Sequence, residues 1–315
     1  MKKIIIFLFA VIISFFFTEL IVRFALHYPV YGVEKKVTGL YSDKLFFPYS
    51  EYWNVEGGNH VFSRNNLGLP GIDVKVDSLS KNVMILGTSF VEAFQFPPED
   101  IATSVFQKKL QQNSSRFQVI NLSYSGNDPY DSYFRLSYFE KEIKPSFVIL
   151  LVDDIYNEWL KKHKHPLNFD SPENFGKEKS GFTQRLFTNL RNHFALINLV
   201  ARALQSEENA NETIETDKPI SQEQIRDQDI PADLFTCLIE YKKKYSDRFL
   251  CLSIMDNDSV NAQLSSFCSQ NKISFDCKKL NIEENKINGE GHLNLKGNKL
   301  LGDFFYESFI KFYKE

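Results

Sequence analysis

Short apolar runs alternate with amphipathic stretches along most of the chain after residue 80. The apolar runs have the length and the bounding turn residues of buried strands, at 82–86, 117–121, 147–152, 248–254 and 273–276. The amphipathic stretches have the apolar spacing of helices, at 99–112, 130–142, 232–245, 259–271 and 296–313. Repeated strand–helix units with apolar strands indicate a parallel sheet covered by helices on both faces. We therefore predict an α/β fold for residues 81–315.

A long uncharged segment precedes this alternation. Lys2 and Lys3 are followed by fifteen uncharged residues, and Glu19 is the one charged residue between positions 4 and 22. Such a segment suffices for a tilted membrane crossing, and no small-residue cleavage pattern follows it. We expect residues 1–25 to form an uncleaved signal anchor, with a cleaved signal peptide as the alternative. The two lysines then stay cytoplasmic, which places the rest of the chain in the periplasm or on the cell surface.

Two further segments lack the regular alternation. Residues 26–80 are rich in Tyr, Phe, Pro, Gly and Asn without sustained periodicity, so we interpret them as an irregular lead-in packed against the domain. Residues from about 160 to 230 are mostly polar and charged, which predicts a solvated insertion. Within the insertion, the stretch 187–204 has helical apolar spacing, and we interpret it as a lid or a membrane-proximal element.

Composition narrows the class of partner. The 315 residues carry a net charge of −3, which does not favour a nucleic-acid partner. The four cysteines form no C-x-x-C pair and do not indicate a zinc site; they are Cys237, Cys251, Cys268 and Cys277. Buried free thiols are the default interpretation, although an exported domain permits a disulfide in one of three pairings.

Two histidines near the start of the insertion resemble a metal pair only in being close in sequence. His163 and His165 are two positions apart and would not share a helix face, so solvated surface histidines are expected. We expect no metal and no cofactor.

Polar residues gather directly after the predicted strands. Gly-Thr-Ser at 87–89 follows the first strand, residues 121–128 follow the second, and Asp153 and Asp154 follow the third. Another polar group, which contains Glu290 and His292, directly precedes the last helix. Parallel strands end at one edge of a sheet, where α/β proteins place their ligand sites, so these groups are expected to meet there.

The residue types at this edge fit acyl transfer through a serine. A serine hydroxyl becomes a nucleophile when a base lies within hydrogen-bond reach, and the base needs an acid to hold its tautomer. Ser89, His292 and Glu290 can fill these three roles. The backbone N–H groups of Ser89 and Gly126 can receive the oxyanion, each contributing about 3 kcal/mol.

Simpler interpretations exist for each piece alone. Thr88 or Ser89 can be a plain helix cap, and residues 126–129 can be an ordinary tight turn. His292 can be a surface histidine, and Glu290 can be an acid that complements a helix dipole. The adjacent carboxylates at 153–154 are weak evidence for a cation site. The convergence of all the groups on one edge favours the catalytic interpretation.

The chain resembles the SGNH hydrolases, also called GDSL esterases and lipases, from about residue 60 to the end. The family's Gly-Asp-Ser block is similar to Gly-Thr-Ser at 87–89, and its second-block glycine is similar to Gly126. Its Gly-x-Asn-Asp block resembles residues 151–154, and its final acid and histidine resemble Glu290 and His292. The lead-in at 66–68 and the tail at 292–297 resemble the membrane-anchored, alginate-acetylation-like branch.

The resemblance implies a flavodoxin-like three-layer α/β/α sandwich with a mainly parallel five-stranded sheet. It also implies a serine esterase or acyl hydrolase that acts on ester-linked acyl groups of envelope carbohydrate or lipid. The same site is compatible with O-acetyl transfer to an envelope polysaccharide. A third hypothesis is a non-catalytic glycan-binding protein on the same fold.

Two positions depart from the family pattern. Thr88 replaces the usual Asp, which is tolerable because the serine is retained. Asp153 stands where the family has the Asn that donates to the oxyanion, and an ionised carboxylate only accepts hydrogen bonds. Asn127 or Asn157 is the alternative donor, unless the register differs by one residue. If no donor replaces it, the site is weakened or retired, which motivates the non-catalytic hypothesis.

Overall fold

The computed structural model describes most of the α/β domain and parts of the segments before it and within its insertion. The described residues are 2–25, 34–35, 45–46, 48–54, 60–75, 80–113, 116–153, 167–170, 186, 190, 194–197, 199–200, 230–287 and 291–313.

A five-stranded sheet, parallel throughout, forms the centre of the domain. Its strands are β5 (Lys81–Leu86), β6 (Phe117–Asn121), β7 (Phe147–Val152), β8 (Phe249–Ser253) and β9 (Ser274–Cys277), and their order in the sheet is β6-β5-β7-β8-β9. Counted along the sequence this is the 2-1-3-4-5 order of the flavodoxin-like fold, whose ligand crevice lies between the first and third strands. The predicted fold class is confirmed, and the crevice is expected between β5 and β7.

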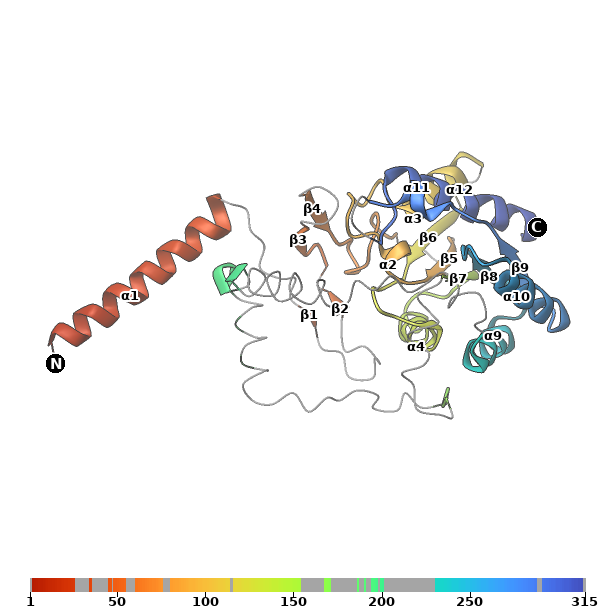
Figure 1. Cartoon of the computed structure of the whole chain (residues 1–315), viewed down its shortest axis with the longest axis horizontal. Helices are drawn as coiled ribbons and strands as arrows, with labels where there is room; N and C mark the ends of the chain where they lie inside the picture. The colour runs from red at the N-terminus through yellow and green to blue at the C-terminus, as the bar shows by residue number, and fades with distance from the viewer. Residues whose placement is uncertain are drawn as a thin grey trace.

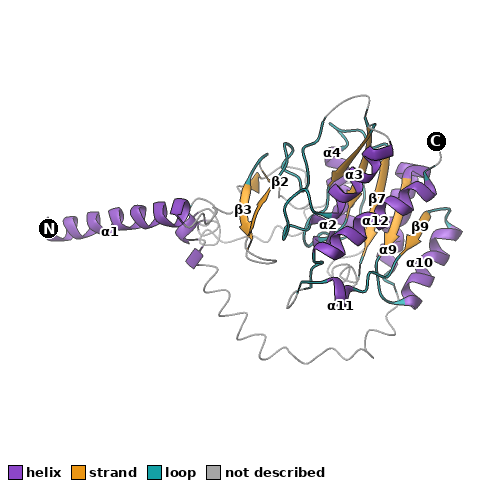
Figure 2. Ribbon diagram, turned by 90° about the horizontal axis from the view of Figure 1, so that it is seen from above, coloured by secondary structure: helices purple, strands orange, loops and turns teal. Residues whose placement is uncertain are grey.

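Helices cover both faces of this sheet (Figures 1 and 2). The helices of the domain are α2 (Ser89–Glu92), α3 (Ala102–Asn113), α4 (Pro129–Phe139), α9 (Ala232–Tyr245), α10 (Asp258–Gln270), α11 (Ile282–Asn285) and α12 (Leu295–Phe312), and a 3-10 turn spans Ser246–Arg248. Alternate residues of a strand point to opposite faces. Val83 and Ile85 therefore pack in the core with α3 and α12, whereas Met84 and Leu86 pack in the core with α4, α9 and α10.

Helices α3 and α12 approach each other closely at Gly302. A Cβ on Gly302 would lie 2.6 Å from Val105 Cβ and 2.7 Å from the carbonyl oxygen of Ala102. We expect Gly302→Ala to lower the free energy of unfolding by about 1–3 kcal/mol because the two helices must separate. Gly291→Ala is the matched control, since a Cβ there meets no heavy atom within 4 Å. Equal urea midpoints for the two variants would contradict this account of the contact.

The lead-in contains two small antiparallel pairs that its irregular sequence does not reveal. Strand β1 (Glu34–Lys35) pairs with β2 (Leu45–Phe46), and β3 (Glu51–Asn54) pairs with β4 (His60–Ser63). A turn built by asparagine side chains follows β4. Asn65 Oδ1 accepts hydrogen bonds from the N–H groups of Leu67 and Leu69, and Leu69 is buried in the core of the domain. The turn after β4 is therefore packed on the domain.

The cysteines in the described residues are free thiols. Cys237, Cys251 and Cys268 are buried, and Cys277 is exposed. A hydrogen bond to Cys268, together with burial, raises the pKa of the Cys251 thiol well above its usual value. Buried free thiols were the default expectation, and Cys277 departs from it because the last residue of an edge strand faces solvent.

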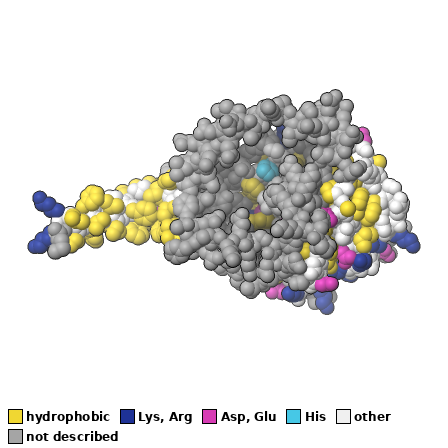
Figure 3. Space-filling model, turned by 60° about the horizontal axis from the view of Figure 1, so that its bottom comes forward, with side chains coloured by type: hydrophobic (Ala, Val, Ile, Leu, Met, Phe, Trp, Pro, Cys, Tyr) yellow, Lys and Arg dark blue, Asp and Glu magenta, His cyan; other side chains and the backbone are white. Residues whose placement is uncertain are grey.

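The N-terminal segment forms a helix that projects from the domain (Figure 3). Helix α1 (Lys2–Leu20) continues through a π-helical turn (Ile21–Ala25), and the most apolar 18-residue window of these 24 residues has a mean hydropathy of 2.8 and is 6% buried. This is one helix long and apolar enough to cross a membrane, and a signal sequence has the same properties. Most of the predicted insertion from 160 to 230 lies outside the described residues.

Candidate active site

The turn from β5 into α2 places Ser89 at the carboxyl edge of the sheet. Gly87 permits this turn because a Cβ on it would lie 2.5 Å from Val91 Cγ2 in the helix that follows. Thr88 is the N-cap of α2, and its Oγ1 accepts from the N–H of Phe90 at 3.4 Å. The cap is thus Thr88, and Ser89 is the first residue of the helix. The Ser89 side chain has no hydrogen bond among the described residues and remains available as a nucleophile.

Thr88 and Asp153 join β5 to β7 at the crevice that the strand order predicts. The Thr88 hydroxyl donates to Asp153 Oδ2 at 2.5 Å, and both residues are buried. Asp153 directly follows β7. The two positions at which the chain departs from the SGNH pattern therefore form one hydrogen-bonded pair. A Thr donor with an Asp acceptor is chemically matched, because a hydroxyl donates and an ionised carboxylate accepts.

The loop after β6 lies beside this turn. The N–H of Tyr124 donates to the carbonyl oxygen of Gly87 at 3.3 Å. Gly126 has a φ of +83°, a conformation that favours glycine. Among the described residues, the N–H groups of Ser89 and Gly126 have no hydrogen-bond partner. Two unengaged backbone donors at the carboxyl edge of a sheet are the elements of an oxyanion hole.

Asn127 and Asp128 complete this loop in different ways. Asp128 is the N-cap of α4 and accepts from the N–H of Asp131 at 2.8 Å, whereas the tight turn lies at residues 124–127, closed by the N–H of Asn127 on the carbonyl oxygen of Tyr124 at 3.1 Å. Burial and the neighbouring Asp128 charge raise the pKa of Asp131 well above its usual value. The Asn127 side chain is buried, and its Nδ2 has no partner among the described residues. Asn127 thus remains a candidate donor.

His292 lies against the helix that carries Ser89. The centroid of its ring is 6.5 Å from that of Phe90 in α2 and 5.7 Å from that of Phe94 just after α2. The backbone holds it there because the carbonyl oxygen of His292 accepts from the N–H of Ile287 at 2.8 Å. The imidazole is half-buried and has no hydrogen bond among the described residues. Catalytic hydrogen bonds often tighten only in the substrate complex, so this arrangement is compatible with a base for Ser89.

A buried carboxylate at the end of α2 connects three parts of the site. Glu92 Oε1 accepts from Arg64 Nη2 at 2.6 Å, and Glu92 Oε2 accepts from both the N–H and the hydroxyl of Ser125 at 2.6 Å. The Arg64 guanidinium also lies 4.0 Å from the centroid of the Phe46 ring, a cation–π arrangement. Glu92 therefore joins the lead-in and the nucleophile helix to the loop that carries Gly126.

A second buried cation lies next to this carboxylate. The Arg135 guanidinium of α4 is 5.3 Å from the centroid of the Tyr124 ring. Burial lowers the pKa of Arg135 to about 10, and the Glu92 charge acts in the opposite direction. The inner side of the site is thus a charged and mostly buried layer. Sequence reasoning missed Arg64, Glu92 and Arg135; the acidic residue among the apolar positions of α2 was the one available signal.

Several predicted site residues cannot be placed. Glu290, Asp154 and Asn157 lie outside the described residues, and so do His163 and His165. Within the part of the chain that the structure describes, no group of three or more His, Cys, Asp or Glu residues could hold a metal ion.

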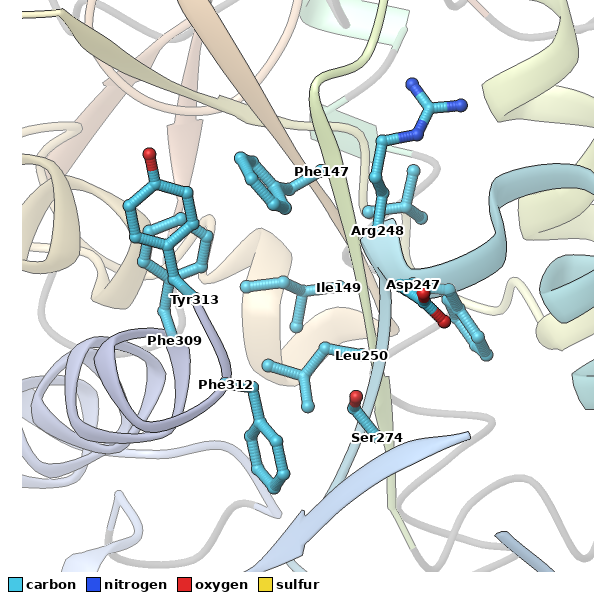
Figure 4. A pocket seen from close by; sticks show the side chains of 11 residues that line it. Phe147, Ile149, Asp247, Arg248, Leu250, Ser274, Phe309, Phe312 and Tyr313 are labelled. Atoms are coloured by element: carbon cyan, nitrogen blue, oxygen red, sulfur yellow. The ribbon is translucent and has the colours of Figure 1, made fainter. Parts of the chain in front are cut away.

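A small pocket lies at the opposite edge of the sheet (Figure 4). Phe147, Phe249 and Ser274 line it, and each is the first residue of its strand. Its volume of about 20 Å³ has room for little more than one water molecule. The pocket is therefore too small for an acyl substrate and is unrelated to the residues around Ser89.

Comparison with known proteins gives matches among solved structures only. No protein-family model matches the chain, and no curated protein does. The similar structures include the psychrotrophic esterase EstA from Pseudoalteromonas sp. (14% identity, 74% of this chain, 98% of that chain, TM-score 0.43). A member of the lipolytic protein G-D-S-L family from Veillonella parvula is also similar (9% identity, 73% of this chain, 96% of that chain, TM-score 0.38). So is a lipase/acylhydrolase from Enterococcus faecalis (11% identity, 74% of this chain, 97% of that chain, TM-score 0.38).

These structural neighbours are described as an esterase, a lipolytic protein of the G-D-S-L family and a lipase/acylhydrolase. Because the identities are low, the roles of individual residues rest on the geometry of this chain alone.

Proposed function

We propose that this chain is an SGNH-type serine esterase that removes ester-linked acyl groups from cell-envelope carbohydrate or lipid. One observation carries the proposal. Ser89 begins α2 at the carboxyl ends of the neighbouring strands β5 and β7, where the N–H groups of Ser89 and Gly126 have no described partner and the His292 ring packs on the same helix. A nucleophile, a base and two donors for an oxyanion thus come from three separate segments of the sequence, around Ser89, Gly126 and His292.

The mechanism assigns one role to each group. Ser89 Oγ attacks the acyl carbon while His292 accepts the hydroxyl proton, and Glu290 is proposed to hold the imidazole in the required tautomer. The oxyanion accepts hydrogen bonds from the N–H groups of Ser89 and Gly126, each worth about 3 kcal/mol. His292 then donates the proton to the leaving oxygen. Water attacks the acyl-enzyme with His292 again as the base, which releases the acid and restores Ser89.

Asp153 provides no oxyanion donor in this mechanism because an ionised carboxylate only accepts. Its hydrogen bond from Thr88 keeps one carboxylate oxygen engaged beside the helix start. The stabilisation then comes from the two backbone donors, with the buried Nδ2 of Asn127 as a candidate third. This arrangement supports a working site despite the departure at position 153.

Asp153→Asn is expected to raise kcat/KM for ester hydrolysis by about tenfold or more. The amide oxygen still accepts from Thr88, while the amide nitrogen adds a donor, and one such donor is worth roughly 10²–10³-fold in kcat. Hydrolysis of p-nitrophenyl acetate by the two proteins measures the change. An unchanged or lower kcat/KM would contradict the assignment of Asp153 as an ionised acceptor beside the oxyanion.

The substrate class follows from the proposed location. An anchored α1 with Lys2 and Lys3 on the cytoplasmic side would place the catalytic domain outside the cytoplasmic membrane, next to envelope glycans and lipids. The same anchor supports a second candidate function, O-acetyl transfer, in which a glycan hydroxyl replaces water in the second half of the reaction.

A panel of substrates tests the proposal. The full chain in detergent is expected to hydrolyse p-nitrophenyl acetate, butyrate or octanoate, and His292→Ala is expected to abolish this turnover. Addition of a glycan acceptor distinguishes the two functions, because transfer gives an acetylated glycan in place of free acetate. Glycan binding without turnover of any ester, unchanged by Ser89→Ala, would contradict the proposal and favour a non-catalytic glycan-binding protein.

A further inference from the structure

The apolar helix α1 contains one buried acid that is held by the insertion. Glu19 is 6% exposed, although Phe16, Phe17 and Leu20 around it are more than half exposed. Glu19 Oε1 accepts from the N–H of Ala195 at 2.9 Å, and Glu19 Oε2 accepts from the N–H of Leu196 at 2.8 Å. Arg23, one turn further along the helix, donates to Oε1 at 3.0 Å. The carboxylate is therefore satisfied within the protein.

The contact continues towards the middle of α1. The rings of Phe15 and Phe194 meet edge to face with centroids 5.4 Å apart. Residues 195–197 are helical, so Glu19 accepts from the first N–H groups of a helical stretch, which lack partners of their own and attract negative charge. Figure 1 shows this stretch, in green, beside the C-terminal end of α1.

The position of Glu19 on α1 sets the depth of this contact in a bilayer. Residues 4–22 of a helix span about 28 Å at a rise of 1.5 Å per residue, close to the roughly 30 Å of a hydrocarbon core. Glu19 then lies about 5 Å from the outer end of that span, and Phe15 lies about 6 Å deeper. Phe194, in contact with Phe15, is at the level of the outer acyl chains.

We propose that the described residues 194–197 and 199–200, here called the interfacial segment, are a second membrane contact, seated in the outer surface of the bilayer by Glu19. The segment is apolar at each of these positions, and Val200 is 51% exposed. Its partner is the lipid surface, because the exposed apolar side chains of α1 adjoin it and the Phe15–Phe194 contact brings it to acyl-chain depth.

This inference goes beyond the proposed esterase activity and requires only that α1 stays in the membrane. It therefore predicts that α1 is an anchor and that it is not removed as a signal peptide. Cleavage after α1 would remove Glu19 and leave the buried N–H of Ala195 without its acceptor, at a cost of about 1–3 kcal/mol. Glu19 is therefore part of the folded structure, and we expect α1 to be retained in the mature protein.

The test uses the full chain in lipid nanodiscs, with an environment-sensitive NBD fluorophore on one introduced cysteine. Cys277→Ser removes the exposed native thiol. Val200→Cys carries the probe, and Ile310→Cys on α12 is the matched control because Ile310 is an aliphatic residue of similar exposure, 47%. Phosphatidylcholine with a 5-doxyl group is expected to quench the probe at position 200 at least twofold and to leave the probe at position 310 unchanged.

The role of Glu19 is tested in the same protein. Glu19→Ala is expected to abolish quenching at position 200, while a probe at Ile12→Cys in α1 remains quenched by 12-doxyl lipid. Equal emission and quenching at positions 200 and 310 would overturn the proposal. So would a mature protein that lacks α1 by mass, or quenching at position 200 that persists in Glu19→Ala.

Discussion

Ser89→Ala is expected to lower kcat for ester hydrolysis by about four to six orders of magnitude. The Ser89 hydroxyl forms the bond to the acyl carbon, and no other group replaces it in the proposed mechanism. The free energy of unfolding is expected to change by less than about 0.5 kcal/mol, because the side chain has no hydrogen bond among the described residues. Steady-state hydrolysis of a p-nitrophenyl ester and urea unfolding measure the two quantities.

Three further variants test whether the loss is specific to the proposed catalytic residues. Ser259→Ala removes an exposed serine of α10 and is expected to retain wild-type activity. His292→Ala is expected to lose about as much activity as Ser89→Ala, and the double variant is expected to lose no more, because the residues act as a unit. Losses that add in the double variant, or a Ser89→Ala protein with more than a few per cent of wild-type kcat, would contradict the assigned roles.

Arg64→Met is expected to lower the free energy of unfolding by about 3–5 kcal/mol. The methionine fills the space of the aliphatic part of the arginine side chain, but the buried Glu92 carboxylate loses its hydrogen-bonded cation and keeps only the nearby Arg135 charge. Among the residues that the structure describes, Ser125 alone then supplies hydrogen bonds to that carboxylate. Urea unfolding of the two proteins measures the loss. Because Ser125 precedes Gly126, kcat is expected to fall as well.

A second substitution separates the loss of the ion pair from the cost of burying one charge without its partner. Glu92→Gln in the Arg64→Met background is expected to restore part of the lost stability, since a neutral amide is less costly to bury than an unpaired carboxylate. Lys243→Met breaks the surface pair with Glu240 and is expected to cost less than about 0.5 kcal/mol. Similar losses of unfolding free energy for Arg64→Met and Lys243→Met would contradict a stabilising role for the buried Arg64–Glu92 pair.

The sheet was predictable because its strands are buried on both faces. Such strands are continuous apolar runs, and the predicted bounds 117–121 and 147–152 coincide with β6 and β7. The amphipathic pattern likewise predicted α9 and placed α12 within one residue at each end. Strands β1–β4 and helix α11 have two to four residues, which is too short for a periodicity to show.

The site was predictable only for residues whose positions follow from the strand order of the sheet. Ser89 and Gly126 follow parallel strands, so the strand order brings them to one edge whatever the side-chain packing. The Arg64–Glu92 pair depends on how the lead-in folds back over α2, and no local pattern records that contact. The contact of Glu19 was equally unpredictable. Within an apolar helix an acid indicates only that one charge is tolerated, whereas the hydrogen bonds that Glu19 accepts come from residues about 176 positions away.

Mass spectrometry of the protein after treatment with a fluorophosphonate tests the central claim most directly. The reagent phosphonylates a serine only when a base and an oxyanion hole activate it. We predict one adduct per chain, on the peptide that contains Ser89, and none in His292→Ala. Folded protein that stays unmodified, or carries the adduct at a different serine, would contradict the assignment of Ser89 as an activated nucleophile.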